Sequence, residues 1–228
     1  MPYGYNGRIL HVDLSSGKID IETPSEMFYR TYFGGSALGL YYVLKNVPKG
    51  ADPLGPDNVL VLSTSVLTGV PVHGLSRSVA TARSPLTGMI GDAQAGGFWP
   101  AELKFAGFEA IVLKGQSPKP VYLWIHDGKA ELRDAGHLWG VENLETMRRI
   151  RTELGDDKIE VTGIGPAGEK LVRYACIVSM ANRAHGRTGM GAVMGSKRLK
   201  AIAVRGRQHP IVADEEAVRR ITRWGVEH

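Results

Sequence analysis

The sequence predicts an α+β fold of two β-sheets with short helices, in which an internal duplication relates the two halves by a pseudo-twofold axis. Three observations predict it. Alternating apolar and polar residues flank a short turn in residues 7–22 and again in residues 120–134, as in β-hairpins. The similar segments FEAIVLKG and LKAIAVRG end at Gly115 and Gly206, which are 91 residues apart. A glycine-rich turn precedes each segment, so the same unit occurs twice.

Composition indicates an ordinary globular chain with a basic surface. Its 228 residues are 43% hydrophobic and 22% charged, and the net charge of +5 favours an anionic partner without separating nucleic acid from a phosphorylated cofactor. Cys176 is the only cysteine, so we expect a buried structural thiol and no disulfide or cysteine metal cluster. The start of the chain is polar, and no apolar run approaches the ~20 residues that span a bilayer. We therefore expect a cytoplasmic protein with no membrane segment.

In the first half, the segment after the hairpin predicts a helix. Apolar residues recur at intervals of three to four over residues 25–47, although Gly34 and Gly35 interrupt the pattern. The other elements are expected in this order: a strand in 57–69, a strand in 76–84, a turn at Gly96 and Gly97, a short helix, and a strand that ends at Gly115.

The second half repeats this order after its hairpin. Residues 141–155 form an amphipathic pattern with a glycine stop, which predicts a helix. Strands are expected in 157–168 and 172–180, followed by a turn rich in glycine and arginine, a short helix, and a strand that ends at Gly206. Matching residues 76–84 with 172–180 places Arg77 opposite Arg173. The spacings drift between the halves, so the duplication is diverged.

The tail predicts a domain boundary. Residues 208–228 have the pattern of a helix that begins a following helical domain, so we expect a first domain in 1–207 and a truncated second one in 208–228. Because the sequence stops inside a helical pattern, we expect an excised domain in preference to a separately encoded subunit.

The turn RAHGRTGMG in the second half predicts a phosphate site. Its glycines let backbone amides approach a ligand, and a helix N-terminus attracts anions. Arg183 and Arg187 add bidentate, charge-assisted contacts. A purely structural turn is the alternative. RAHGRTG is also similar to the pyrophosphate loop of acetyltransferases that bind acyl-coenzyme A, but its duplicated counterpart argues against that interpretation.

The first half contains the matching turn at Gly96 and Gly97, which Arg77 can approach from the neighbouring strand. A second anion site of similar geometry is expected there, with close packing of the glycines as the alternative. We call the turn at Gly96 and Gly97 with Arg77 the first cradle, and the turn with Arg183 and Arg187 the second cradle. Two such cradles suit a ligand with two similar phosphate arms. No segment has the P-loop pattern, the histidines lack metal-ligand spacing, and no Ser-His-Asp order or paired carboxylates stand out. No catalytic residue is predicted.

Five motifs carry a family resemblance: GRILHVDLSSGKI, RSPLTG, AGGFWPAELKFAGFEAIVLKG, IGPAGEKLVRYA and RAHGRTGMGAVMGSKRLKAIAV. With them, the chain from Tyr5 to Arg207 resembles the N-terminal domain of the tungsten-containing aldehyde ferredoxin oxidoreductase family. The last motif is long and highly specific. The resemblance implies a domain that forms a base beneath a metal held by two pyranopterin dithiolenes. Each pterin ends in a phosphate, and a magnesium ion bridges the phosphates.

The resemblance also implies roles for individual residues. Arg77 would contact pterin or phosphate, and Gly96 would lend its backbone amide. Around the second pterin it implies contacts from Arg183, Ala184, Gly186 and Arg187. The carbonyl of Ala184 and the side chain of Gln94 are candidate Mg²⁺ ligands. Gln94 stands where the family pattern has asparagine, which keeps the amide oxygen but extends it by one methylene.

Two further departures bear on the expectations. His185 and Thr188 replace smaller residues of the family pattern and are expected to tighten the loop. Family members are also much longer, and their later helical domains supply the cysteines of a [4Fe–4S] cluster, the acid-base residues near the metal and most of the substrate pocket. This chain alone is therefore expected to be inactive.

The leading expectation is a cofactor-binding domain of a tungsten or molybdenum enzyme that oxidises aldehydes to carboxylic acids and passes electrons through the cluster to ferredoxin. The alternative is a non-catalytic pterin-binding subunit or scaffold that works with a separate iron–sulfur subunit. Nucleic-acid binding is a third hypothesis, but no nucleic-acid motif or aromatic platform supports it, so no nucleic-acid partner is expected. A homo-oligomer is kept as an open alternative to a monomer.

Overall fold

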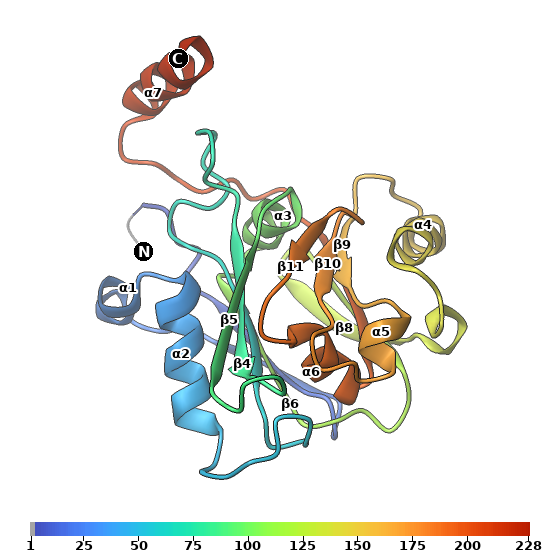
Figure 1. Cartoon of the computed structure of the whole chain (residues 1–228). Helices are drawn as coiled ribbons and strands as arrows, with labels where there is room; N and C mark the ends of the chain where they lie inside the picture. Colours follow the sequence, from blue (N-terminus) through green and yellow to red (C-terminus); the bar gives the residue numbers. More distant parts are fainter. Residues whose placement is uncertain (1–2) are drawn as a thin grey trace.

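The structure is a computed structural model that describes residues 3–228. Each half of the chain forms one six-stranded sheet (Figure 1). The strand order is β2-β1-β6-β3-β4-β5 in the first sheet and β8-β7-β12-β9-β10-β11 in the second. The second order repeats the first with every strand replaced by its counterpart, which confirms the predicted α+β fold with duplicated sheets.

The first half contains the following elements: β1 (Ile9–Asp13), β2 (Lys18–Glu22), α1 (Glu26–Tyr32), α2 (Gly35–Asn46), β3 (Leu60–Ser63), β4 (Ser78–Arg83), β5 (Ile90–Ala95), α3 (Trp99–Phe105) and β6 (Ala110–Lys114). The hairpin β1–β2 is antiparallel, and β1 also pairs in parallel with β6. The sheet is therefore mixed. After α3 the chain re-enters it as β6, which lies between β1 and β3 and runs parallel to β1.

The second half contains the corresponding elements: β7 (Val121–His126), β8 (Lys129–Asp134), η1 (Gly136–Leu138), α4 (Asn143–Leu154), β9 (Glu160–Gly163), α5 (Pro166–Glu169), β10 (Ile177–Ser179), β11 (Arg183–His185), α6 (Met190–Ser196) and β12 (Leu199–Arg205). Its hairpin turns at Asp127 and Gly128, which both have positive φ, as an Asp-Gly turn favours. The predicted helix stop at Gly155 is confirmed, since this residue ends α4 in the left-handed conformation.

The helix expected in residues 25–47 is two helices. The break lies at Phe33 and Gly34, where φ is 56° and 122°. A Cβ on Gly34 would lie 2.4 Å from the carbonyl oxygen of Thr64, so only glycine allows the chain to approach the end of β3 here. The interruption that the sequence showed is therefore a change of direction, and α2 lies against β3 and β4.

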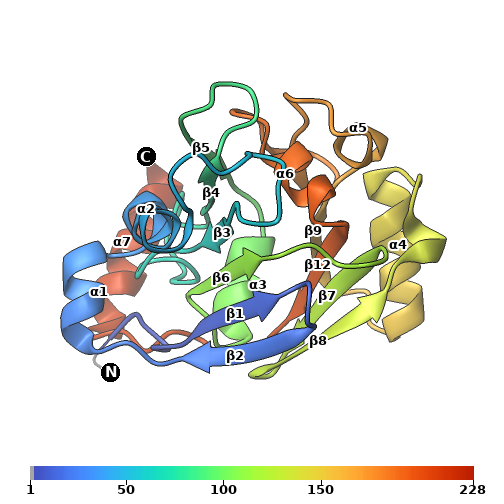
Figure 2. The same ribbon diagram turned by 90° about the horizontal axis from the view of Figure 1, so that it is seen from below.

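The two sheets enclose a shared core. Apolar residues of both sheets and of α3 and α6 form the largest buried cluster. Smaller clusters on the outer faces join α1 and α2 to the first sheet and α4 to the second. The layers are visible in Figures 1 and 2, where α2 and α4 lie on opposite sides of the molecule and α3 and α6 lie between the sheets.

Two buried side chains join the repeats directly. The indole nitrogen of Trp99 donates to the Ile202 carbonyl at 3.0 Å, from α3 to the second sheet. The ammonium of Lys197 donates to the carbonyls of Asn58 and, at 3.1 Å, Gly115. Burial lowers the pKa of Lys197 to about 8.

The tail forms α7 (Glu215–Glu227), which extends away from the sheets (Figure 1). The Asp214 carboxylate caps it by accepting from the Ala217 amide at 2.8 Å. None of its residues is buried. No helix in the described range is long and apolar enough to cross a membrane.

Candidate functional site

Strand pairing determines which residues of the two halves are equivalent. Ala110 and Ala201 hold the same place in the two repeated strand segments. Ala110 pairs with Ser63 and Ala201 pairs with Gly163, so these two partners are equivalent. One strand further out, they pair with Val79 of β4 and Val178 of β10.

Gln94 and Ala184 occupy one structural position that the duplication repeats. Val79 pairs with Gln94 on β5, and Val178 pairs with Ala184 on β11. Each lies on the outermost strand of its sheet. Two residues later each strand is followed by a glycine, Gly96 or Gly186. The two candidate magnesium ligands are therefore related by the internal repeat.

The predicted match of Arg77 with Arg173 is wrong. Arg77 lies two residues before Val79, so its equivalent lies two residues before Val178 and is Cys176. The connection from β9 to β10 contains α5, which has no counterpart between β3 and β4, and the pattern match slipped by three residues across it. Cys176 is also partly exposed, whereas a buried thiol was expected.

Two adjoining cavities lie where β5 approaches β11. The smaller has a volume of about 710 Å³ and is lined by Asp92, Ala93, Gln94, Ala184, Gly186 and Arg187. The larger, about 1190 Å³, shares Gln94 and Ala184 with it. Its lining also includes the remaining predicted residues Arg77, Gly96 and Arg183. The fold thus brings all seven predicted site residues to one connected region.

The arginines of this region have no partner within the described chain. Among residues 3–228, no ion pair and no side-chain hydrogen bond involves the guanidinium of Arg77, Arg183 or Arg187. Arg205, by contrast, pairs with Glu102 and Asp156. The larger cavity holds two of these cations, Arg77 and Arg183, whereas the smaller one holds Arg187 together with the Asp92 carboxylate, so the positive charge that suits an anionic ligand gathers mainly in the larger cavity.

Gly186 is not required by the packing of the chain itself. Its φ lies outside the left-handed region, and an added Cβ would meet no atom closer than the Ala184 carbonyl oxygen at 3.9 Å. For Gly96 the nearest atom would be the Ser76 carbonyl oxygen at 3.5 Å, an ordinary contact. The space beside both glycines is open toward the cavities, so each can serve a closely bound ligand.

The other glycines of the second turn have a different role. A Cβ on Gly189 would lie 1.9 Å from the Arg173 carbonyl oxygen, and one on Gly191 would lie 2.4 Å from that of Cys176. Gly189 and Met190 at the start of α6 are buried. The helix N-terminus therefore packs against protein, and the residues of this turn that line the cavities are Arg183, Ala184, Gly186 and Arg187.

His185, through its side chain, and Thr188, through its backbone carbonyl, contact the first repeat. His185 is fully buried, its Nε2 lies 3.2 Å from the Ser78 hydroxyl, and burial lowers its pKa to about 4. Thr188 has a φ of 61°, and its carbonyl accepts from the Ser84 hydroxyl at 2.7 Å. Both contacts join residues of the second cradle to the first repeat.

Among the lining residues that sequence reasoning did not predict, Asp92 and Met180 bear on the site. Asp92 lines the smaller cavity and lies two positions before Gln94 on β5, so strand alternation could have found it. Met180 lines the larger cavity, and no local pattern pointed to it. Within the described range, no cluster of three or more histidine, cysteine or acidic residues could hold a metal ion.

The family model for the N-terminal domain of aldehyde ferredoxin oxidoreductase matches residues 9–206. This chain belongs to the aldehyde ferredoxin oxidoreductase family. The tungsten-containing aldehyde ferredoxin oxidoreductase of Thermococcus kodakarensis is 47% identical over 214 residues, which are 94% of this chain and 35% of that protein. The Pyrococcus furiosus enzyme of the same name is 45% identical over the same shares.

Two less similar relatives carry other names. The aliphatic sulfonate oxidoreductase, WOR-like subunit, of Pyrococcus furiosus is 34% identical and covers 97% of this chain and 38% of its own length. The active-site complex BamBC of benzoyl coenzyme A reductase, solved with 1,5-dienoyl-CoA, superposes with a TM-score of 0.91 at 38% identity. That match covers 95% of this chain and 33% of the other. The chain thus corresponds to the N-terminal domain and spans about a third of these relatives.

Proposed function

We propose that this domain binds a tungsten or molybdenum bis-pyranopterin cofactor and its bridging Mg²⁺. One observation carries the proposal: Gln94 and Ala184, equivalent in the two repeats, line a shared cavity region whose walls hold three unpaired guanidinium groups. A duplicated site suits a ligand with two similar anionic arms. The tungsten in the names of the relatives is consistent with the metal.

The oxygen atoms at the repeated position fit Mg²⁺. The ion prefers oxygen ligands, takes few of them from protein, and completes its octahedron with phosphates and water. The Ala184 carbonyl and the amide oxygen of Gln94 are such ligands, and both residues are exposed in the cavity region. Gln94 and Ala184 would therefore provide one ligand from each repeat.

The arginines would hold the phosphate arms. Arg187 lines the smaller cavity, and Arg77 and Arg183 line the larger. A guanidinium binds phosphate through two parallel hydrogen bonds, and Gly96 and Gly186 leave room for the ligand to reach the backbone. When bound, the metal and its dithiolenes would supply the redox chemistry, and these contacts would fix their position and influence their potential.

For the whole protein we infer an enzyme that oxidises aldehydes to carboxylic acids, with ferredoxin as the electron acceptor. The names of the most similar relatives support this activity. The [4Fe–4S] cluster and the substrate pocket would lie in C-terminal helical domains, and the enzyme would be cytoplasmic. Relatives named for a sulfonate and for benzoyl coenzyme A share this domain, so the substrate would be selected elsewhere.

Arg187 provides the direct test. In the full-length protein, Arg187→Ala should lower the tungsten and pterin content several-fold, because a desolvated contact to phosphate is lost. Arg187→Lys should recover only part of it, since lysine lacks the bidentate fork. Metal content is measured by mass spectrometry and pterin by fluorescence of its oxidised form.

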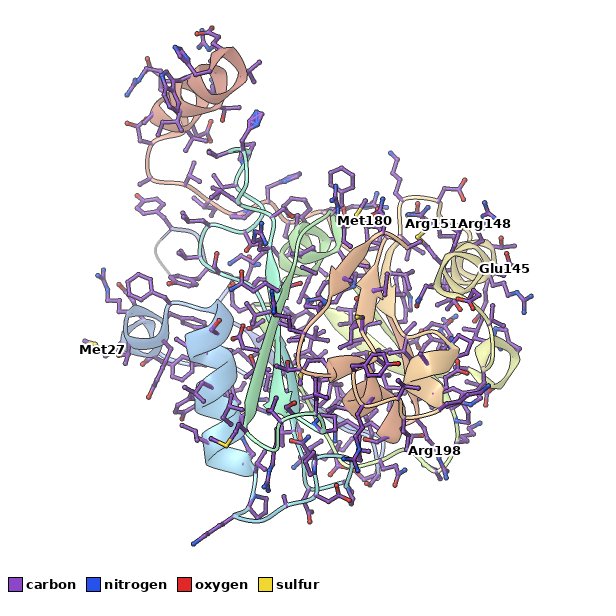
Figure 3. All side chains as sticks on the ribbon, in the orientation of Figure 1. Met27, Glu145, Arg148, Arg151, Met180 and Arg198 are labelled. Atoms are coloured by element: carbon purple, nitrogen blue, oxygen red, sulfur yellow. The ribbon has the colours of Figure 1, made fainter. Side chains whose placement is uncertain are left out.

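Arg148→Ala is the matched control. Arg148 is an exposed arginine on α4 (Figure 3) and lines neither cavity. Removing the Arg148 side chain should leave the tungsten and pterin contents unchanged. Wild-type cofactor content in the folded Arg187→Ala protein would refute the assignment of this residue, and a wild-type protein without pterin would refute the proposed function.

The alternative function is a pterin-binding subunit that works with a separate iron–sulfur subunit. The relative named as a WOR-like subunit favours keeping this candidate. The two functions differ in where the cluster lies. Iron and acid-labile sulfide that stay with this polypeptide after subunits are separated under native, anaerobic conditions support the first function, whereas their presence in a second polypeptide supports the alternative.

A further inference from the structure

The loop between β10 and β11 is strained. Met180, Ala181 and Asn182 link Ser179 to the next strand, and the Asn182 amide donates to the Ser179 carbonyl at 3.2 Å. Met180 and Ala181 have φ values of 54° and 58°. Asn and Gly favour such a turn, while residues with a larger side chain are disfavoured in it. The hairpin turn between β7 and β8, in the same sheet, uses Asp and Gly, which also have positive φ.

The Met180 side chain contacts the glycine turn of the other repeat. Its sulfur accepts the Phe98 amide at 3.0 Å, and a Cβ on Gly97 would lie 2.6 Å from that sulfur. The Gly97 carbonyl, on the same peptide group, accepts from the hydroxyl of Ser76. One peptide group is therefore held from two sides, by the hairpin of the second repeat and by the residue next to Arg77. Figure 3 shows Met180 at the tip of its hairpin beside α3.

This junction connects the elements that carry the candidate site. Arg183 and Ala184 lie directly after the strained loop, and Gly96 lies directly before the peptide that Met180 holds. Arg77 directly follows Ser76, whose hydroxyl binds the same peptide from the other side. Met180 also lines the larger cavity, so a change in its side chain alters both the wall of the cavity and the spacing of its two sides.

We propose that Met180 is a positioning residue, whose thioether holds the β10–β11 hairpin on the Gly97–Phe98 peptide and thereby sets the separation of the two cofactor cradles. The inference rests on the proposed function. Two non-glycine residues adopt left-handed φ in this loop while the Met180 sulfur contacts the other repeat, and strain of this kind is typical of a segment with a positioning role.

Two variants of the full-length protein test it. The double variant M180N/A181G relaxes the turn, so it should unfold at a higher temperature than wild type. It also removes the thioether, so its tungsten and pterin content should fall at least threefold. Met180→Leu keeps the apolar volume and the strain but removes the sulfur acceptor. It should retain less cofactor than wild type, and the electron paramagnetic resonance g-values of its one-electron-reduced metal, the d¹ state, should shift.

Asp127→Asn in the β7–β8 turn is the control, because it changes a similar turn away from the cavities and should leave cofactor content and g-values unchanged. In M180N/A181G, a higher unfolding temperature together with a lower cofactor content would show that Met180 positions the site and does not merely stabilise the fold. Wild-type content and spectrum in both Met180 variants would overturn the inference while leaving the proposed function intact. Absence of pterin from the wild type would overturn both.

Discussion

Gly186→Ala separates a role in ligand binding from a role in folding. Nothing in the chain requires glycine at this position, because φ lies outside the left-handed region and an added methyl would have its nearest neighbour 3.9 Å away. A ligand that lies against the backbone in the smaller cavity would meet that methyl directly. The substitution should therefore harm cofactor binding and spare the fold.

The two effects have different magnitudes. Replacing glycine by alanine at a compatible position restricts the unfolded chain and stabilises by about 0.4–1 kcal/mol. For a domain of this size that corresponds to about 1–4 °C in Tm. Displacing a bound phosphate or pterin from the backbone should weaken binding at least about tenfold, which is about 1.4 kcal/mol.

The assay compares thermal unfolding with tungsten and pterin content in the full-length protein. Gly189→Ala is the matched control, since its methyl would lie 1.9 Å from the Arg173 carbonyl oxygen and φ is 74°. This control should lose about 3 kcal/mol of stability through overpacking and strain. A folded Gly186→Ala protein with full cofactor content, or one as destabilised as the control, would refute the reasoning.

Two further predictions concern the contacts between the repeats. Because the pKa of Lys197 is about 8 in the folded protein and about 10.5 when unfolded, its buried charge opposes folding below pH 8, and the unfolding free energy should rise by roughly 3 kcal/mol from pH 8 to 10.5. Lys197→Met should remove this part of the pH dependence in denaturant titrations, and identical profiles would contradict it. Trp99→Phe should cost about 1–3 kcal/mol, because the buried hydrogen bond from the indole to the Ile202 carbonyl is lost and the smaller ring leaves space in the core, and an unchanged midpoint of denaturation would argue against that.

Much of the fold was predictable because its signals are local. Alternating residues at 7–22 and 120–134 specify hairpins, and the two segments that end at Gly115 and Gly206 reveal the duplication. The break in residues 25–47 was visible, but its reason was not, since Gly34 is needed only because Thr64 lies against it. A local sequence pattern predicts that a turn occurs, but it does not show which distant residue the turn will pack against.

The candidate site shows the same division. Its seven residues were proposed from motifs and resemblance, and the structure brings them to one region without testing their roles. The match of Arg77 with Arg173 failed because strand pairing, which is absent from the linear sequence, determines equivalence. Met180 was missed for a similar reason, as its contact with Phe98 joins residues 82 positions apart.

The sequence by itself determined the two hairpins, the repeated central strands, the glycine-rich turns and the positive residues beside them, because periodicity and turn chemistry act between near neighbours; it did not predict the edge strands β5 and β11. Only the tertiary structure decided that β5 and β11 meet at shared cavities, which of the glycines are open to a ligand, and which arginines stay unpaired. Those features follow from packing α3 and α6 between two sheets, where the burial of distant apolar residues determines which edges come together.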